Sequence, residues 1–194
     1  HYMNDEGYTN EILTGDIHTA NQLAAGLDTR DQAKTFIYAF LYGAGDSKIG
    51  SIVGGTRRDG ARLKEKFLAN TPALGKLRVR VGLAASRGYV YGLDRRRVSI
   101  RSEHAALNSL LQSAGAIVMK KALCLLDEYA TIWGIDYNFI GNIHDEIQTE
   151  VREEKAEVFG RLATSCIQAA GTFYNLNCPL AGDYKVGDSW ADTH

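Results

Sequence analysis

The sequence is poor in proline and in cysteine. Two prolines, Pro72 and Pro179, occur in 194 residues, so long helices can run without interruption. The three cysteines are Cys124, Cys166 and Cys178, and no two of them form a C-x-x-C pair. This spacing indicates free thiols in a reducing compartment and argues against a thiolate metal site.

Long apolar runs are also missing. The longest stretches, AGAIVM at 114–119 and ALCLL at 122–126, are separated by Lys120 and Lys121 and fall well short of the roughly 20 residues that span a bilayer. Residues 1–8 contain neither a basic leader nor an apolar signal core and begin without Met. We therefore expect a segment cut from a longer protein, cytoplasmic (in the host cell if the source is viral), with no membrane partner.

Two segments of the chain each have little charge of one sign, although the net charge of the whole is only −1. Residues 57–101 contain thirteen Lys and Arg against three acids, a net charge of +10. Residues 122–194 contain twelve acids against four Lys and Arg, a net charge of −8. The basic segment suits a polyanion, although a solvated charged face has the same composition.

The apolar periodicity predicts an α+β fold that is mostly helical. The clearest helix spans 30–42, with Asp28 or Thr29 as its cap and Gly43 after its end. Further elements are expected at these positions: helices over 58–70, 74–85, 102–129 and 153–174, a hairpin over 88–101, a strand, polar turn and strand over 138–151, and a short strand with a loop over 179–194.

The first helix carries a row of four residues that could hold a nucleotide. Arg30, Lys34, Tyr38 and Tyr42 are four apart, so they share one face of a helix, with two cations near its amino end and two phenols beyond. A nucleoside triphosphate needs positive charge for its phosphates and flat rings for its sugar and base. An ordinary amphipathic helix can show the same spacing, so spacing alone leaves both interpretations open.

The segment RDQAKTFIYAFLYG at 30–43 resembles the R-x-x-x-K-x-x-x-(F/Y)-x-x-x-Y-G pattern of the fingers helix in family A, DNA polymerase I type, DNA polymerases. The resemblance implies that Arg30 and Lys34 hold the incoming triphosphate, that Tyr38 packs against the sugar and that Tyr42 lies by the nascent base pair. Tyrosine at position 38 implies tolerance of dideoxynucleotides. The segment GDIHTANQLA at 15–24 resembles the family's DIH segment, which places His18 at the same phosphates.

Residues 104–116, HAALNSLLQSAGA, resemble the family stretch that touches template and primer. The resemblance makes His104, Asn108 and Gln112 DNA-binding, with His104 standing where many members have Arg. The basic segment ending at Arg101 would lie along template phosphates. Without the resemblance, the two amides are more simply read as a solvated helix edge.

The sequence IHDEIQTEV at 143–151 resembles the family's second catalytic carboxylate motif. Asp145 would then be a ligand of Mg²⁺, Glu146 would assist from nearby, and His144 would approach the primer end. A tight turn between strands is a rigid place for a metal ligand, although an isolated HDE triplet can also be an exposed polar turn.

Together these motifs imply a phage-like family A DNA polymerase with fingers at 1–101 and palm at 102–194, residues 1–6 trailing from a palm strand further upstream. The implied reaction is attack of a primer 3′ hydroxyl on a deoxynucleotide, with two Mg²⁺ ions and primer-template DNA as partner. The family's first catalytic aspartate lies in a D-x-S-x-x-E-like motif that residues 1–17 lack, so this chain should be inactive without upstream palm, thumb and exonuclease regions. The segment VGDSWADTH at 186–194 resembles the family's carboxy terminus. The alternatives are a non-catalytic nucleic-acid-binding module and an acidic protein-interaction domain.

Overall fold

The computed structural model describes residues 1–194, and the chain divides into two compact units. The first unit comprises His1–Tyr91 and Arg97–Leu111, and the second comprises Gly92–Arg96 and Gln112–His194. The division falls inside one long helix. The subdomain boundary at 101/102 that the sequence suggests stays a prediction.

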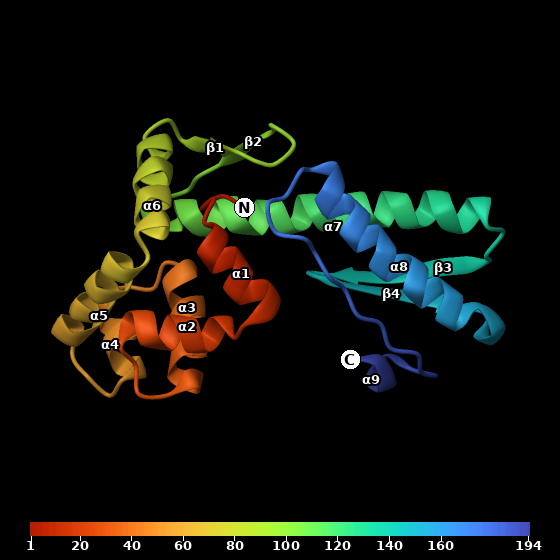
Figure 1. Ribbon diagram of the computed structural model, residues 1–194. Coiled ribbons are helices and arrows are strands. Elements are labelled where there is room, and N and C mark those ends of the chain that lie inside the picture. The colour runs from red at the N-terminus through yellow and green to blue at the C-terminus, as the bar shows by residue number, and fades with distance from the viewer. The chain divides into compact units, whose positions relative to one another are not determined.

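Helices dominate both units, and each unit contains one two-stranded antiparallel sheet (Figure 1), which confirms the α+β fold. The first unit contains α1 (Glu6–Thr14), α2 (Ile17–Ala25), α3 (Arg30–Leu41), α4 (Asp46–Ile52), α5 (Arg57–Asn70), α6 (Pro72–Ala85), β1 (Tyr89–Tyr91), β2 (Arg97–Ser99), the 3-10 turn η1 (Glu103–Ala105) and the start of α7 (Ala106–Ile132). The second unit contains the rest of α7, β3 (Tyr137–Ile143), β4 (Glu146–Val151), α8 (Glu153–Phe173) and α9 (Trp190–Thr193).

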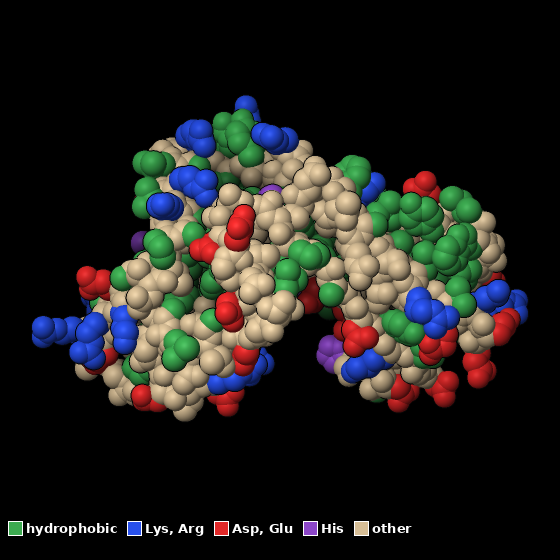
Figure 2. Space-filling view, viewed as in Figure 1, with side chains coloured by type: hydrophobic (Ala, Val, Ile, Leu, Met, Phe, Trp, Pro, Cys, Tyr) green, Lys and Arg blue, Asp and Glu red, His purple; other side chains and the backbone are tan.

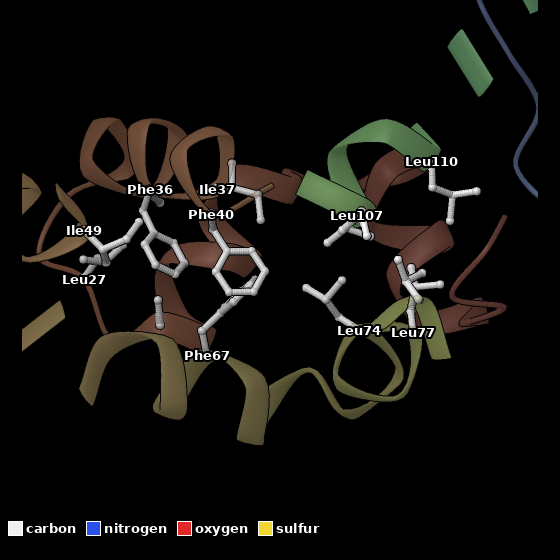
Figure 3. Packing of buried hydrophobic residues seen from close by; sticks show 14 of the residues in the cluster. Leu27, Phe36, Ile37, Phe40, Ile49, Phe67, Leu74, Leu77, Leu107 and Leu110 are labelled. Atoms are coloured by element: carbon white, nitrogen blue, oxygen red, sulfur yellow. The ribbon is translucent and has the colours of Figure 1, made fainter. Parts of the chain in front are cut away.

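The core of the first unit is built around three phenylalanines, Phe36 and Phe40 from α3 and Phe67 from α5 (Figure 3). The Phe67 ring meets Phe36 and Phe40 edge-on at centroid distances of 5.1 and 5.4 Å. Each ring is buried, and burying such a side chain stabilises a fold by about 1.5–3 kcal/mol. The guanidinium of Arg78 lies 5.0 Å from the Phe40 ring centroid. One face of α3 is therefore fixed by packing.

Both ends of α3 are determined by its local sequence. Thr29 is the N-cap and forms a capping box with Gln32, which satisfies backbone N–H groups that have no partner inside the helix. At the other end Gly43 adopts a left-handed backbone, with φ +79°, a conformation that favours glycine. The predicted start and stop signals are confirmed.

The β1–β2 hairpin closes the first unit with one apolar face. Val90 pairs with Val98, and Val90 is buried in the core while Val98 packs against it. The flanking pairs Tyr89↔Ser99 and Tyr91↔Arg97 point to the opposite face because side chains alternate along a strand. The hairpin thus joins the core and leaves a polar and aromatic face outside.

In the second unit, α8 packs against α7. Leu126 and Ala130 of α7 are buried with Phe159, Leu162 and Cys166 of α8. Strands β3 and β4 pair in register from Ile143↔Glu146 to Tyr137↔Val151, with an irregularity between Phe139 and Gly141. The predicted strand, acidic turn and strand are confirmed, and the three cysteines are free thiols as expected.

The prediction of a short strand in the tail over 179–194 is wrong. Residues 179–189 form neither helix nor strand, and α9 follows them. Side-chain contacts, and not strand pairing, hold this segment. Tyr184 donates a hydrogen bond to Glu157 of α8 at 2.6 Å. The Tyr184 ring packs against Gly160, in the space that a side chain there would occupy. The Glu157 carboxylate raises the pKa of Tyr184.

Four helices went unpredicted, namely α1, α2, α4 and the short α9. The others begin and end within a few residues of the expected positions, and the long helix runs three residues further than predicted, to Ile132.

Counted together with η1, the long helix is long and apolar enough to cross a membrane by length and composition, with a mean hydropathy of 1.3 over its best window. The two short apolar runs predicted no segment of membrane-spanning length. The helix has that length because Lys120 and Lys121 interrupt the apolar runs but not the helix. A core helix of a water-soluble protein has the same properties, and Val118, Ala122, Leu126 and Ala130 of this helix are buried against other parts of the chain.

Candidate nucleotide and metal sites

The exposed face of α3 carries the four residues that the sequence singled out. Arg30, Lys34, Tyr38 and Tyr42 are all exposed, whereas Ala33, Phe36, Ile37 and Phe40 on the same helix are buried. The exposed fractions of Tyr38 and Tyr42 are 49% and 57%, which is high for aromatic side chains. The row of two cations and two phenols is therefore presented to solvent and is not part of the core.

Arg30 is already paired within the first unit. Its Nε and Nη2 donate to Oδ2 and Oδ1 of Asp16 at 2.6 and 3.1 Å, a bidentate arrangement that orients the guanidinium. The hydrogen bonds from Arg30, and then that from Thr19, hold the pKa of the Asp16 carboxyl well below its ordinary value. A guanidinium has five N–H donors, so donors remain for a phosphate.

Asp16 also begins α2 and so positions His18. Its Oδ1 accepts the backbone N–H of His18 at 3.0 Å, and its Oδ2 accepts the Thr19 hydroxyl at 2.8 Å. The His18 ring lies 6.4 Å from the Tyr38 ring, centroid to centroid, and its Nδ1 is buried without a hydrogen-bond partner. The structure therefore places His18 beside Tyr38 of the row on α3, and its contact with phosphates stays a prediction.

The predicted DNA-binding residues lie on η1 and α7 and just before them. His104 and Arg101 are exposed, Asn108 is half-buried, and Gln112 is exposed four residues further along α7. A side chain on Gly43 would come within 2.7 Å of the His104 carbonyl oxygen, so the end of α3 and η1 are packed backbone to backbone. Asn108 belongs to the first unit and Gln112 to the second.

In the second unit, His144 and Asp145 form the two-residue turn between β3 and β4. His144 has a left-handed backbone with φ +56°, which is uncommon for a residue other than glycine. Both side chains are exposed. The hairpin thus displays the Asp145 carboxylate at a fixed turn, where it can bind a cation.

Glu146 is held by the carboxy-terminal segment. Its carboxylate accepts hydrogen bonds from Gln148 Nε2 at 2.6 Å and Trp190 Nε1 at 3.0 Å, and His194 Nδ1 lies 3.0 Å away. The Gln148 bond, followed by those of His194 and Trp190, lowers the pKa of Glu146. The resemblance implies only that Glu146 assists Asp145. In this structure its carboxylate already has three partners within the chain.

The turn supplies an incomplete magnesium site. Carboxylate oxygens are the ligands that Mg²⁺ prefers, and one or two of them with substrate phosphates are enough to hold it. Asp145 fits this requirement, but no group of three or more His, Cys, Asp or Glu side chains in residues 1–194 lies close enough together to hold a metal ion. Other oxygens, from a substrate or another carboxylate, would have to complete the site.

Comparison with known proteins decides the family. The model of DNA polymerase family A matches residues 10–192. The chain belongs to this family. The resemblance drawn from the fingers helix and the HDE turn is confirmed at the level of the whole chain.

Family A members from phages are the more similar relatives. The DNA-directed DNA polymerase of Escherichia phage T7 is 45% identical over 209 aligned residues that cover 96% of this chain and 30% of the relative. That of Escherichia phage Phieco32 is 42% identical, with 96% of this chain and 32% of the relative covered. DNA polymerase I of Geobacillus stearothermophilus is 27% identical over 91% of this chain and 21% of the relative. This family A chain is phage-like and spans about a third of the length of its phage relatives.

A solved structure shows the same fold. The POL domain of Pol1 from M. smegmatis, in complex with DNA primer-template and dNTP, aligns with a TM-score of 0.77 at 20% identity. The alignment covers 88% of this chain and 34% of that one. The backbone of this chain thus has the fold of that POL domain.

Sequence reasoning missed Asp16, Trp190 and His194. Asp16 stands in the DIH segment, two residues before His18, and its role as both cap and ion-pair partner could have been suspected from its place before a helix. The contacts of Trp190 and His194 with Glu146 join residues 44 and 48 apart, and no local pattern indicates them.

Proposed function

We propose that the protein carrying this chain is a template-directed DNA polymerase that adds deoxynucleotides to a primer 3′ hydroxyl. The exposed row of two cations and two tyrosines on α3 carries the proposal, because these four side chains face solvent while the opposite face of the helix is buried. Family A membership supports the same activity.

The residues of the first unit bind the incoming nucleotide. Lys34 and the remaining donors of Arg30 contact the triphosphate, supported by the amino end of α3. His18, whose ring lies 6.4 Å from that of Tyr38, contacts the same phosphates. Tyr38 packs against the sugar, where its hydroxyl supports the use of dideoxynucleotides, and Tyr42 lies by the new base pair.

The residues of the second unit serve the reacting groups. Asp145 holds Mg²⁺, His144 approaches the primer end, and Glu146 orients the turn through its bonds to the carboxy-terminal segment. When bound, two magnesium ions stabilise charge on the attacking and leaving oxygens. His104, Asn108 and Arg101 of the first unit, and Gln112 of the second, contact primer-template DNA.

A second catalytic aspartate has to come from outside these 194 residues. Asp145 belongs to no group of three or more His, Cys, Asp or Glu side chains that could hold a metal ion, and two ions need more ligands than one aspartate supplies. We therefore expect the 194-residue chain to bind nucleotide but not to extend primers.

Calorimetric titration with a deoxynucleoside triphosphate, with and without Mg²⁺, tests the proposal against the non-catalytic alternative. Joint binding of nucleotide and Mg²⁺, weakened in Lys34→Ala and unchanged in Lys48→Ala on α4, supports the polymerase. Binding of DNA alone, with no affinity for nucleotide, would favour a nucleic-acid-binding module. Binding only to a protein partner, insensitive to salt, would favour the acidic interaction domain.

A further inference from the structure

The outer face of the β1–β2 hairpin is a cluster of aromatic and arginine side chains to which the nucleotide and metal sites assign no role. Tyr89, Tyr91, Arg97 and Ser99 share this face because Val90 and Val98 occupy the other. Figure 2 shows hydrophobic side chains between basic ones where Figure 1 places β1 and β2.

Contacts inside the cluster fix its geometry. The Tyr89 and Tyr91 rings meet edge-on with centroids 5.4 Å apart. The guanidinium carbons of Arg97 and Arg87 lie 4.8 and 5.7 Å from the Tyr89 centroid. A hydrogen bond from Tyr89, and then one from Arg97, lowers the pKa of the Tyr91 hydroxyl, so that hydroxyl is held while the ring stays exposed.

The exposed Tyr91 ring is not needed to anchor the hairpin. The ring is 47% exposed, and the hairpin is already anchored through Val90 on the opposite face. Ordered, exposed aromatic side chains beside arginines are the usual platform for unpaired nucleic-acid bases, because every base has a flat face to stack.

The charge around the platform suits a polyanion. The first-unit residues of the hairpin and its flanks, 86–91 and 97–101, contain Arg87, Arg97 and Arg101 and no acid. These cations can contact phosphates on either side of a base stacked on Tyr91. A duplex offers the phosphates but keeps its bases stacked inside, so it would leave Tyr91 without a partner.

We propose that this hairpin face binds unpaired single-stranded DNA, with one base stacked on Tyr91 and neighbouring phosphates on Arg87 and Arg97. The site lies apart in sequence from the nucleotide row of α3 and needs neither a nucleotide nor Mg²⁺. In a polymerase it would hold the part of the template that has not yet been copied. The binding claim itself does not depend on polymerase activity.

Fluorescence anisotropy with a labelled single-stranded oligodeoxynucleotide tests the site in the full polypeptide that carries this chain, without nucleotide or Mg²⁺. Tyr91→Ala should weaken binding roughly five- to 150-fold, the range for loss of one stacked base. Tyr91→Phe keeps the ring and should bind like the unaltered protein, as should Tyr129→Ala, which removes another exposed tyrosine. Arg87→Ala should reduce the slope of log affinity against log salt by about 0.7, as for one phosphate contact on a single strand.

An abasic oligonucleotide separates stacking from charge. The unaltered protein and Tyr91→Ala should bind it equally. Unchanged affinity of Tyr91→Ala for the normal oligonucleotide would overturn the proposal, and so would an equal loss on the abasic oligonucleotide or on duplex DNA. If Tyr91→Ala does not fold, photocrosslinking of the unaltered protein to iododeoxyuridine-containing DNA decides: crosslinks at Tyr89 or Tyr91 support the site, and crosslinks only elsewhere refute it. Neither failure would affect the α3 proposal, which the nucleotide titration tests separately.

Discussion

Arg30 and Asp16 form a bidentate ion pair in which Nε and Nη2 of the guanidinium lie 2.6 and 3.1 Å from the two carboxylate oxygens. Asp16 is also the N-cap of α2. The Asp16 carboxylate therefore caps α2 and also pairs with Arg30, the cation that we assign to the triphosphate. A phosphate that binds Arg30 has to share it with Asp16.

Asp16→Asn should tighten binding of a deoxynucleoside triphosphate several-fold. The change removes a negative charge from the phosphate site, and asparagine still caps α2. Asp31→Asn on α3 makes the same charge change but leaves the Arg30–Asp16 pair intact, so calorimetry should show a smaller gain for it. Equal gains, or weaker binding by Asp16→Asn, would contradict competition for Arg30.

The same pair should resist mild acid. Because the pKa of Asp16 is lowered in the folded state, its contribution to stability is present above the ordinary aspartate pKa and is lost as the pH falls through the lower folded value. In Asp16→Asn this acid-dependent part of the denaturant stability should be smaller. Identical stability profiles between neutral pH and strong acid for the two proteins would show that the ion pair does not contribute.

Lys34→Ala should weaken triphosphate binding by roughly 1.5–3 kcal/mol, the range for a hydrogen bond to a charged group. Lys34 is exposed on α3, so the protein should melt at an unchanged temperature. Lys48→Ala on α4 removes another exposed lysine of the first unit and is the matched control. Equal affinity of the two variants would remove Lys34 from the site.

Gly43→Ala should destabilise the first unit by at least about 1–2 kcal/mol, the cost of a left-handed backbone for a residue with a side chain. The new Cβ would also meet the His104 carbonyl oxygen at 2.7 Å. Gly115→Ala within α7, where no atom lies within 4 Å of the added Cβ, should instead stabilise by about 0.5–1 kcal/mol. Urea unfolding measures both, and losses of equal size would show that the left-handed position is unimportant.

Acid should release the carboxy-terminal segment from Glu146. The folded-state pKa of Glu146 is lowered, so its bonds to Gln148, His194 and Trp190 stabilise the segment above the ordinary glutamate pKa and are lost as the pH falls through the lower folded value. Trp190 fluorescence, in a Trp133→Phe background that leaves it as the single tryptophan, should change below pH 4.5. Glu146→Gln should lack this transition, and a transition unaffected by that change would assign it to another group.

Where several local signals agreed, the sequence predicted the fold correctly. In α3 the buried positions recur at helical spacing, Thr29 caps the start and Gly43 follows the end, so each signal supports the others. The turn of β3–β4 was predictable for a similar reason, since apolar strands flank a polar pair. Helix α1 has no buried residue and α4 has seven residues including Gly50, so neither shows a clear apolar period.

The candidate site was predictable only as far as its local patterns reach. The row on α3 is a spacing of four along one helix, but the Arg30–Asp16 pair joins residues 14 apart. The hydrogen bond from Trp190 to Glu146 joins residues 44 apart. It forms only because the tail packs beside β4. Such contacts follow from tertiary packing and leave no periodic trace in the sequence.

Primer extension on a primed template with Mg²⁺ and deoxynucleotides tests the central claim most directly. We expect the full polypeptide that carries this chain to extend the primer, Asp145→Ala in it to abolish extension without unfolding it, and Asp136→Ala, which removes another exposed acid of the second unit, to have little effect. The 194-residue chain alone should not extend. Extension by Asp145→Ala would contradict the metal assignment, and failure of the folded full polypeptide to extend any primer would contradict the proposed polymerase activity.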